Sequence, residues 1–469
     1  MVNLLLVLFT PLATLLFLPL KRKSRGFFYS ISLLMACSSI WFSFHLEDLE
    51  YAYEPFGFRI MVDSYARVFL ELISCTWFIS IIYSYEFTKY HFQEKREQFF
   101  LFLNTVLTVA CLNACAGNLT TLFIFYLIGI PLTYPLLTIR GNSEALKAGK
   151  KFLKQTLLPA LFIFLPAIVI TKILIGQTSF DGSSTFESNL VDPVVGGFVL
   201  ALFIIGISKN SVFPFHTWLP GASPAPAPVS GLIHSVATVK TGSIALIKIT
   251  VYIFGLDYIH LLTNEFITGG WLAYLCGATA IYTAYRALTN DDLKTRFGFS
   301  TVGQLSYIIL AILVGTKVSI LAAILHIITH AIAKSCLFYV AGFFNSVYQT
   351  TSAKQISKIM PHTRPVALVI AICGLSITGF PFLAGFYSKD MMLIEEWNAH
   401  HYASAIFLVV GSIVNILYII GPVRSAFNRP NPNFVPKPIP FSMQVTFAVS
   451  IALIVGSNYY VPFIINLFN

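Results

Sequence analysis

Charged residues are scarce in this sequence, and long polar segments are almost missing. Lys, Arg, Asp and Glu make up 11% of the 469 residues, whereas an average soluble domain contains about 25%. Hydrophobic residues account for 56%. Apolar runs of about 20 residues, long enough to cross the hydrocarbon core of a bilayer, recur along the whole chain. The composition excludes an ordinary soluble protein and predicts an all-α polytopic membrane protein.

Motifs that hold cofactors are missing as well. The sequence contains no glycine-rich nucleotide fingerprint and no phosphate-binding loop. Its seven cysteines all fall within apolar runs, which argues against a disulfide framework or a zinc cluster. We therefore expect no cofactor, no metal and no catalytic site in this chain, so that any redox or ATP-driven step belongs to another subunit.

The apolar runs predict fourteen membrane-spanning helices. We interpret the first run as a retained helix rather than a signal peptide, because its positive charges follow the apolar residues instead of preceding them. The predicted spans are residues 2–20, 27–45, 65–84, 99–117, 119–139, 152–173, 195–213, 229–254, 267–288, 298–315, 318–344, 365–388, 402–423 and 443–466.

The charged residues between these spans alternate in sign. Loops after odd-numbered spans are basic and include Lys21 to Arg25, Lys147 to Lys154, Lys294 and Arg296, Lys354 and Lys358, and Arg424 and Arg429. Loops after even-numbered spans are acidic or neutral and include Glu47 to Glu54, Asp181 to Asp192, and Glu395 and Glu396. The positive-inside rule then places the basic loops in the cytoplasm and both termini on the outer side of the cell's inner membrane. The net charge of +10 thus reflects membrane orientation rather than nucleic-acid binding.

One short pattern occurs twice. Phe-Pro-Phe stands at 213–215 and again at 380–382, each within or just after an apolar span and near one lysine, Lys209 or Lys389. Proline breaks a helix, and paired broken helices are typical of transporters built from inverted repeats around a site at mid-membrane. We therefore predict helix breaks at Pro214 and Pro381. The expected units are residues 1–98 with the first three helices, 99–254 as the first repeat, 267–424 as the second repeat, and 443–469 as a C-terminal helix.

Ionisable residues lie inside several spans, where a charged group is costly and usually functional. His326, His330 and Lys334 are spaced four residues apart, which places them on one helix face. A desolvated lysine releases its proton more readily than a lysine in water, and histidine exchanges protons near neutral pH. The residues therefore predict a proton relay. Its expected members are Lys209, His234, Lys240, His326, His330, Lys334 and Lys389.

Four segments resemble, in the same order, the signature motifs of the antiporter-like proton-translocating membrane subunits. This family includes subunits of Mrp-type antiporters, of respiratory complex I and of related hydrogenases. The segments are PFHTWLPGASPAPAPVSGLIHSVATVKTG (214–242), NDDLKTRFGFSTVGQLSY (290–307), HIITHAIAKSCLFYVAG (326–342) and LSITGFPFLAGFYSKDMML (375–393). The surroundings of Lys240 and Lys389 look more like the A and D subunits of Mrp-type antiporters, or the distal subunit of complex I, than the other members.

The resemblance implies a hydrated axis across the middle of the membrane, along which protonation moves between two half-channels. The matching residues are Lys209 in a broken seventh span, Lys240 in the eighth, His326, His330 and Lys334 in the eleventh, and Lys389 in a broken twelfth. We expect His234 to bridge Lys209 and Lys240, and we expect Trp218 to anchor the turn between them at the cytoplasmic interface.

One position departs from the family pattern. Members normally carry a glutamate in the fifth span that pairs with the lysine of the seventh, and the matching residue here is Leu127. Three explanations remain open. The subunit is a non-pumping scaffold, or another acid such as Glu71 or Asp390 replaces the glutamate, or a partner subunit supplies the carboxylate.

The leading interpretation is a proton-translocating subunit of a membrane complex, with or without Na⁺ exchange, closest to an Mrp-type antiporter subunit. The alternatives are a subunit of an NADH:quinone oxidoreductase-like or hydrogenase complex, a non-pumping scaffold, and a coupling subunit for inorganic-carbon uptake. A quinone-reductase activity would belong to the complex rather than to this chain. The expected partners are other membrane subunits and lipid, not nucleic acid.

Overall fold

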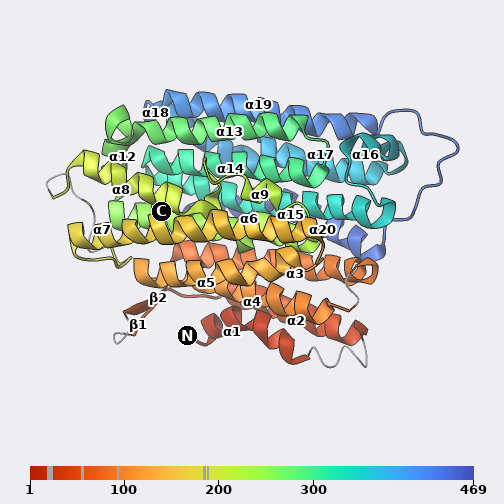
Figure 1. Cartoon of the computed structure of the whole chain (residues 1–469), viewed down its shortest axis with the longest axis horizontal. Coiled ribbons are helices and arrows are strands. Elements are labelled where there is room, and N and C mark those ends of the chain that lie inside the picture. Colours follow the sequence, from red (N-terminus) through yellow and green to blue (C-terminus); the bar gives the residue numbers. More distant parts are fainter. Residues whose placement is uncertain (18–24, 54–56, 92–93, 183–185, 187–189, 469) are drawn as a thin grey trace.

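The protein is a bundle of long helices. The computed structural model describes residues 1–17, 25–53, 57–91, 94–182, 186 and 190–468, and most of these are helical. Among them, ten helices are long and apolar enough to cross a membrane, and three shorter apolar helices accompany them. Most of the long helices lie side by side with their axes roughly aligned (Figure 1). The expectation of a helical membrane protein with many spans is confirmed, although the described residues also include one β-hairpin.

The first half of the chain contains one β-hairpin, and its helices are interrupted by several short 3-10 or π turns, labelled η. Its elements are α1 (Val2–Ala13), α2 (Arg25–Phe44), β1 (Leu49–Tyr53), β2 (Phe58–Val62), α3 (Ser64–Tyr90), α4 (Arg96–Ala114), α5 (Leu119–Thr138), α6 (Ser143–Pro159), η3 (Ala160–Phe164), α7 (Leu165–Ile175), α8 (Pro193–Gly206), η4 (Ser208–Asn210), α9 (Trp218–Gly221), α10 (Ala227–Leu232), η5 (Ile233–Ala237), α11 (Val239–Lys248) and η6 (Ile249–Phe254).

The second half is helical in all its named elements. These are α12 (Leu256–Asn264), η7 (Phe266–Gly270), α13 (Trp271–Thr289), α14 (Leu293–Val314), α15 (Lys317–Tyr348), α16 (Ala353–Ile359), η8 (Met360–His362), α17 (Arg364–Thr378), α18 (Ala384–Asn398), α19 (Tyr402–Ser425) and α20 (Phe441–Phe468). Several of the helices begin at a residue that favours a helix start. Asp63, Asn118 and Asp292 each accept a hydrogen bond from a backbone N–H of the first turn, which satisfies a donor that the helix itself leaves free.

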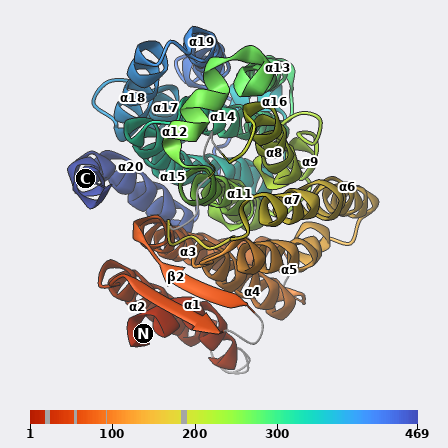
Figure 2. The ribbon, with the colours of Figure 1, turned by 90° about the vertical axis from the view of Figure 1, so that its left-hand side faces the viewer.

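Helices α14 and α15 form the centre of the bundle. The most apolar 18-residue window of each is completely buried within the protein. The end-on view in Figure 2 shows both, together with α11, surrounded by the other helices. Polar residues on these three helices are therefore shielded from lipid, and an ionisable group there can be accommodated at membrane depth only by protein or water contacts.

Two apolar helices are broken near the prolines that the sequence singles out. Helix α8 ends at Gly206, and the chain then passes through η4 and a left-handed residue, Ser211, before it reaches Pro214. Helix α17 ends at Thr378, and α18 starts at Ala384 after a turn that contains Pro381. The first break thus begins earlier than its proline, whereas the second contains it.

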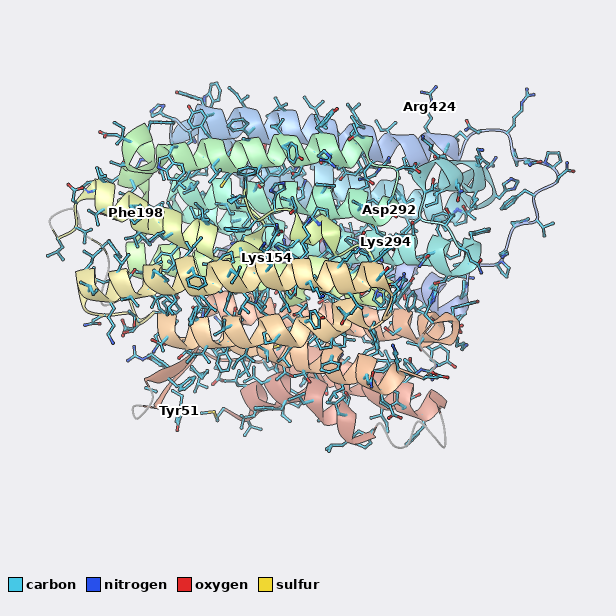
Figure 3. The ribbon with its side chains drawn as sticks, in the orientation of Figure 1. Tyr51, Lys154, Phe198, Asp292, Lys294 and Arg424 are labelled. Atoms are coloured by element: carbon cyan, nitrogen blue, oxygen red, sulfur yellow. The ribbon has the colours of Figure 1, made fainter. Side chains whose placement is uncertain are left out.

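The two ends of the bundle differ in the residues they carry. Both termini lie toward the end with the β1–β2 hairpin, on the left in Figure 1. Figure 3 shows Tyr51 and Phe198 toward this end, and Arg424 and Lys294 toward the other. This arrangement agrees with loops that alternate between two sides. Of the loop charges named from the sequence, Lys21 to Lys23, Glu54 and Glu187 lie outside the described residues.

One assignment from the sequence is wrong. We expected Glu395 and Glu396 in a loop after a span that ends at residue 388, but both lie within α18, which continues to Asn398. The reason is the helix break. The turn at residues 379–383 delays the start of the second helical segment, so that its last turn falls on these two glutamates.

Candidate ion pathway

Lys209 lies in the broken segment after α8 and is held by helix α5. Its Nζ donates to the carbonyl oxygen of Tyr126 at 3.0 Å and lies 4.0 Å from the centre of the Tyr126 ring. The backbone N–H of Lys209 donates to the Tyr126 hydroxyl at 3.1 Å. The side chain is 3% exposed. Lys209 therefore carries a buried amine that is bound to a neutral carbonyl oxygen.

Neighbouring side chains satisfy the backbone groups that the break in α8 sets free. The indole N–H of Trp218 donates to the Ser208 carbonyl at 3.0 Å, and the Tyr126 hydroxyl accepts from the backbone N–H of Lys209 at 3.1 Å. Such partners are what irregular backbone requires at membrane depth. Trp218 is fully buried, so our expectation that it anchors the turn at a membrane interface is wrong, because its indole is needed inside the break.

Lys240 and His234 lie on the next apolar segment, which runs from α10 to η6. Lys240 is 0% exposed, and its Nζ has no hydrogen-bond partner among the described residues. The His234 ring packs against Phe338 of α15, with ring centres 4.2 Å apart, and Lys334 lies within electrostatic range. Our expectation that His234 bridges Lys209 and Lys240 has no support in these contacts, since η5 turns the imidazole toward α15.

Helix α15 carries three of the expected residues on one face. His326 is within hydrogen-bond distance of Gln304 (3.1 Å) and Ser388 (3.2 Å). His330 follows one turn later, and its ring centre lies 6.0 Å from that of His326. Neither ring nitrogen of His330 has a partner in the described part of the chain.

Lys334 completes the face, and its Nζ donates to the Ser300 hydroxyl at 2.7 Å. Lys240 and Lys334 both act electrostatically on His330. The spacing of four residues thus produces the shared face that the sequence predicts, and it brings this face near Lys240.

Lys389 lies at the other end of the series, one turn into α18. Its Nζ donates to the Ser412 hydroxyl at 2.7 Å and lies 5.1 Å from the centre of the Tyr307 ring. The side chain is buried, and Lys389 acts electrostatically on His326. The second broken helix therefore places its lysine beside the histidines of α15.

The buried lysines of this series have no carboxylate partner within the described part of the chain. None of the ion pairs between described residues involves Lys209, Lys240, Lys334 or Lys389. Leu127, at the position of the family glutamate, is an apolar side chain packed against the core.

The two acids that we considered as replacements are engaged elsewhere or unpaired. Glu71 of α3 accepts a hydrogen bond from the Tyr460 hydroxyl of α20. Asp390 is half-buried and forms no ion pair with any described residue. Of the three explanations for the missing glutamate, replacement by one of these acids has no support from the contacts.

Sequence reasoning missed one ion pair, in which the lysine is fully buried and the aspartate is 11% exposed. The side chain of Lys248 is 0% exposed, and its Nζ lies 3.3 Å from the Asp63 carboxylate. The same Nζ donates to the Ala116 carbonyl at 3.1 Å, and Tyr252 donates to Asp63 at 3.0 Å. A single aspartate at a helix start carries no sequence signal for such a pairing, because its partner lies 185 positions later.

Sequence reasoning also missed the position of Lys294. We counted this residue among the loop charges, yet it is 3% exposed and donates to the Ser223 and Ala225 carbonyls. It also lies within electrostatic range of His234. Lys294 therefore extends the buried basic residues toward the end of the bundle where α14 begins.

Chemically, the arrangement is a chain of amines and imidazoles that are buried among hydroxyls, carbonyls and aromatic rings. We refer to Lys209, His234, Lys240, His326, His330, Lys334 and Lys389 as the basic row. Groups of this kind can hold and pass protons, and seven of them within apolar spans are hard to explain as packing, since each charge costs free energy there.

The sequence comparison assigns the family. Residues 116–415 match the family described as NADH:quinone oxidoreductase/Mrp antiporter, TM, and the match covers more than half of the chain. The chain belongs to this family. The resemblance inferred from the four motifs is thereby confirmed, and both broken helices and the whole basic row fall within the matched residues.

Relatives come from more than one kind of complex. The A/B subunit of a probable K⁺/H⁺ antiporter of Rhizobium meliloti (strain 1021) is 28% identical over 354 residues, which are 73% of this chain but 33% of that protein. This chain therefore spans about a third of that relative's length. The N subunit of the NADH-quinone oxidoreductase of Desulforudis audaxviator (strain MP104C) is 26% identical over 396 residues, which are 82% of this chain and 76% of the relative.

The fold is shared with a solved respiratory assembly. A chain of the membrane-bound sulfane sulfur reductase, an archaeal respiratory membrane complex, superposes with a TM-score of 0.84. The alignment covers 100% of this chain and 96% of that chain at 20% identity. At this identity the likeness establishes the fold alone.

Proposed function

We propose that the chain is a proton-translocating subunit of a multi-subunit complex in the inner membrane of the cell. The observation that carries the proposal is the basic row. Its seven side chains are all at least 93% buried, and its lysines have no carboxylate partner within the described chain. A structural role would favour apolar residues at these positions, because each charge is costly in the membrane.

In the proposed mechanism, protons pass along the basic row between two half-channels, one beside each broken helix. Lys209 and Lys389 are the terminal groups. Lys240 and the histidines of α15 lie between them, and a proton that arrives at one group shifts the balance of charge at the next. His326 lies within electrostatic range of both Lys389 and Lys240, and His330 within range of Lys240, which supports a place for the histidines between the two lysines. The first relative is named as a K⁺/H⁺ antiporter subunit, which makes K⁺ a counter-ion to test. Na⁺ is the second, because the four motifs resemble those of Mrp-type antiporters.

The proposal includes the finer topology inferred from the sequence. It has fourteen spans, both termini on the outer side, and two inverted repeats, residues 99–254 and 267–424, each with one broken helix. In support, a buried lysine lies in the first break and another lies in the helix that follows the second break, and both termini lie toward the same end of the bundle.

A second candidate function is that of a non-pumping scaffold that occupies a position in such a complex. The observation in its favour is Leu127. Without the family glutamate, the Lys209 ammonium is bound to the backbone carbonyl of Tyr126 instead. Such a scaffold would retain the fold and its partners but would lack a carboxylate that modulates proton loading.

The deciding experiment is Lys209→Ala in the intact complex, reconstituted into vesicles that contain a pH-sensitive dye. We expect proton translocation to fall at least tenfold while the complex still assembles, because the first terminal group is lost. Lys358→Ala is the matched control, since this lysine is exposed on α16. Undiminished translocation in the Lys209 variant, with an intact complex, would favour the scaffold. Repeating the assay with Na⁺, K⁺ or neither tests ion exchange.

A further inference from the structure

A buried carboxylate lies two helical turns beyond Lys389. Glu396 is 0% exposed, and neither of its carboxylate oxygens has a hydrogen-bond partner among the described residues. Residues seven positions apart share a helix face, and they are separated by about 10 Å along the axis. Lys389 and Glu396 therefore lie on the same buried face of α18.

A buried tyrosine of α14 lies near both residues. On the face of α18 between Lys389 and Glu396 lies Met392, which is fully buried and carries no group that could pass a proton. Tyr307 of α14 provides a hydroxyl for a proton path that avoids Met392. The centre of the Tyr307 ring lies 5.1 Å from the Lys389 Nζ, and Glu396 is within electrostatic range of Tyr307. The buried Tyr307 hydroxyl forms no hydrogen bond of normal geometry with a described residue, although the side chain of Asn415 on α19 lies beside it.

Residues that flank Glu396 in the chain line a cavity at one end of the bundle, although Glu396 itself is not part of that lining. The cavity has a volume of about 810 Å³ and lies where α18 ends and α19 begins, next to α12. Its lining includes His260, Thr316, Glu395, His401 and Ser404. Figure 1 shows this part of the bundle at the end that carries the β1–β2 hairpin, which is the outer side in the proposed topology.

The wall of the cavity next to Glu396 is polar and has unused hydrogen-bonding atoms. The backbone N–H of His401 donates to the Glu396 carbonyl at 2.8 Å. The Nε2 of His401 and the hydroxyl of Ser404 are buried without a partner among the described residues. Atoms of this kind normally bind ordered water. Burial, and then the neighbouring His260, lower the pKa of His401 to about 4. This imidazole is therefore neutral at pH 7 and does not retain a proton that passes it.

We propose that Glu396 is the outlet group of the pathway, which accepts the proton from Lys389 and releases it into the cavity between α12, α18 and α19. In this step an N–H bond of the Lys389 ammonium breaks, and an O–H bond forms on the Glu396 carboxylate, by way of the Tyr307 hydroxyl. The products are a neutral amine and a carboxylic acid. The acid then gives its proton to water in the cavity, past His401 and Ser404, and returns to the carboxylate.

A structural role does not account for Glu396. A buried carboxylate without a partner is unfavourable unless it takes up a proton, and an apolar residue would fill the site better. Glu395, one residue earlier, shows the alternative, because it lines the cavity and accepts a hydrogen bond from Thr316 at 2.6 Å. The inference rests on the proposed function, since it assigns the exit of that same pathway.

The test compares Glu396→Gln with Glu144→Gln in the reconstituted complex, since Glu144 is exposed in the first turn of α6 and is not part of the cavity lining. Glutamine keeps the shape of the side chain but cannot carry the proton, so we expect translocation to fall at least tenfold in E396Q and to stay within twofold of wild type in E144Q. Glu396→Asp should retain part of the rate. In Glu396→Ala, added formate should restore translocation by serving as a mobile carboxylate, an effect that a merely structural side chain would not produce.

The outcomes separate this inference from the proposed function. A wild-type rate in E396Q, together with a loss in Lys209→Ala, overturns the outlet and leaves the proposed function standing. Wild-type rates in both variants overturn both. If the wild-type complex itself translocates no protons, infrared spectroscopy tests whether Glu396 takes up a proton. A protonated Glu396 gives a carboxylic C=O band in the wild type that E396Q lacks. Absence of that band from the wild type overturns the outlet role of Glu396. If E396Q fails to assemble, the test uses E396D and the E396A variant with added formate. A translocation rate that formate does not restore in E396A then overturns the outlet role of Glu396.

Discussion

At the scale of single residues, the buried lysines divide into two kinds. Lys248 is bound to the Asp63 carboxylate, whereas Lys209 and Lys389 are bound to a carbonyl and a hydroxyl. A carboxylate holds the charge of an ammonium in place, and a neutral oxygen stabilises that charge less. We infer that Lys248 serves stability and that the lysines of the basic row exchange protons.

This division predicts the effect of Asp63→Asn. Removing the carboxylate leaves the fully buried Lys248 charge without its counter-ion, which is expected to destabilise the protein by about 3–5 kcal/mol. The measurement is denaturation of the purified protein in detergent. Replacing both partners, as in Asp63→Asn with Lys248→Met, should restore most of the loss, because no uncompensated charge then remains.

Asp48→Asn is the control for that prediction. Asp48 pairs with Arg67 at 3.4 Å, but its side chain is 72% exposed. Solvent screens such pairs, which contribute about 0–1 kcal/mol. Equal destabilisation by the two aspartate variants would contradict a structural role for the buried pair.

At the scale of elements, the turn between α17 and α18 sets the position of everything on α18. Gly379 has a positive φ of 83°, which favours glycine, and it ends α17. Gly385, in the first turn of α18, faces the Ser376 carbonyl so closely that a Cβ there would lie 1.8 Å from its oxygen. Lys389 and Glu396 follow on the same helix, so this close approach also positions them.

Gly385→Ala is therefore expected to disturb both stability and transport. Because the obstacle is backbone, α17 and α18 must move apart, at a cost of about 1–3 kcal/mol or more. We expect a lower unfolding temperature and a reduced rate of proton translocation. Gly421→Ala is the matched control on α19, since nothing lies within 4 Å of a Cβ there. A loss in the control as large as in Gly385→Ala would refute the steric explanation.

At the scale of the whole molecule, the proposed function makes the chain one subunit of a larger assembly. The basic row has no carboxylate partner among the described residues. A neighbouring protein that presents an acid near Lys209 would supply the missing partner. This is the third explanation for Leu127, and the contacts within the chain leave it open.

Purification of the tagged chain from its native membrane, in mild detergent, tests this view. We expect several other membrane subunits to co-purify in fixed ratio. Flavin and iron–sulfur subunits among them would identify a redox-driven pump, and small hydrophobic subunits alone would identify a cation/proton antiporter. A homogeneous, monomeric protein without partners would contradict the assignment to a complex.

The fold class and most of the basic row could be predicted from the sequence. Long apolar runs, the repeated Phe-Pro-Phe and the spacing of His326, His330 and Lys334 are local patterns, and each helix follows them independently of its neighbours. The surroundings of His234 and the burial of Glu396 could not be predicted in this way. The first depends on the direction in which η5 turns, and the second depends on where α18 begins after its break.

Hydropathy and the four ordered motifs were enough to identify a helical membrane protein of the antiporter-like family, because both are properties of short segments. Which buried charges are paired emerged only from the packed bundle. Asp63 meets Lys248 across 185 positions, Tyr126 meets Lys209 across 83, and Glu396 is enclosed without a partner among the described residues. The pairing of charges depends on which helices pack together, and that is a property of the whole chain rather than of any one segment.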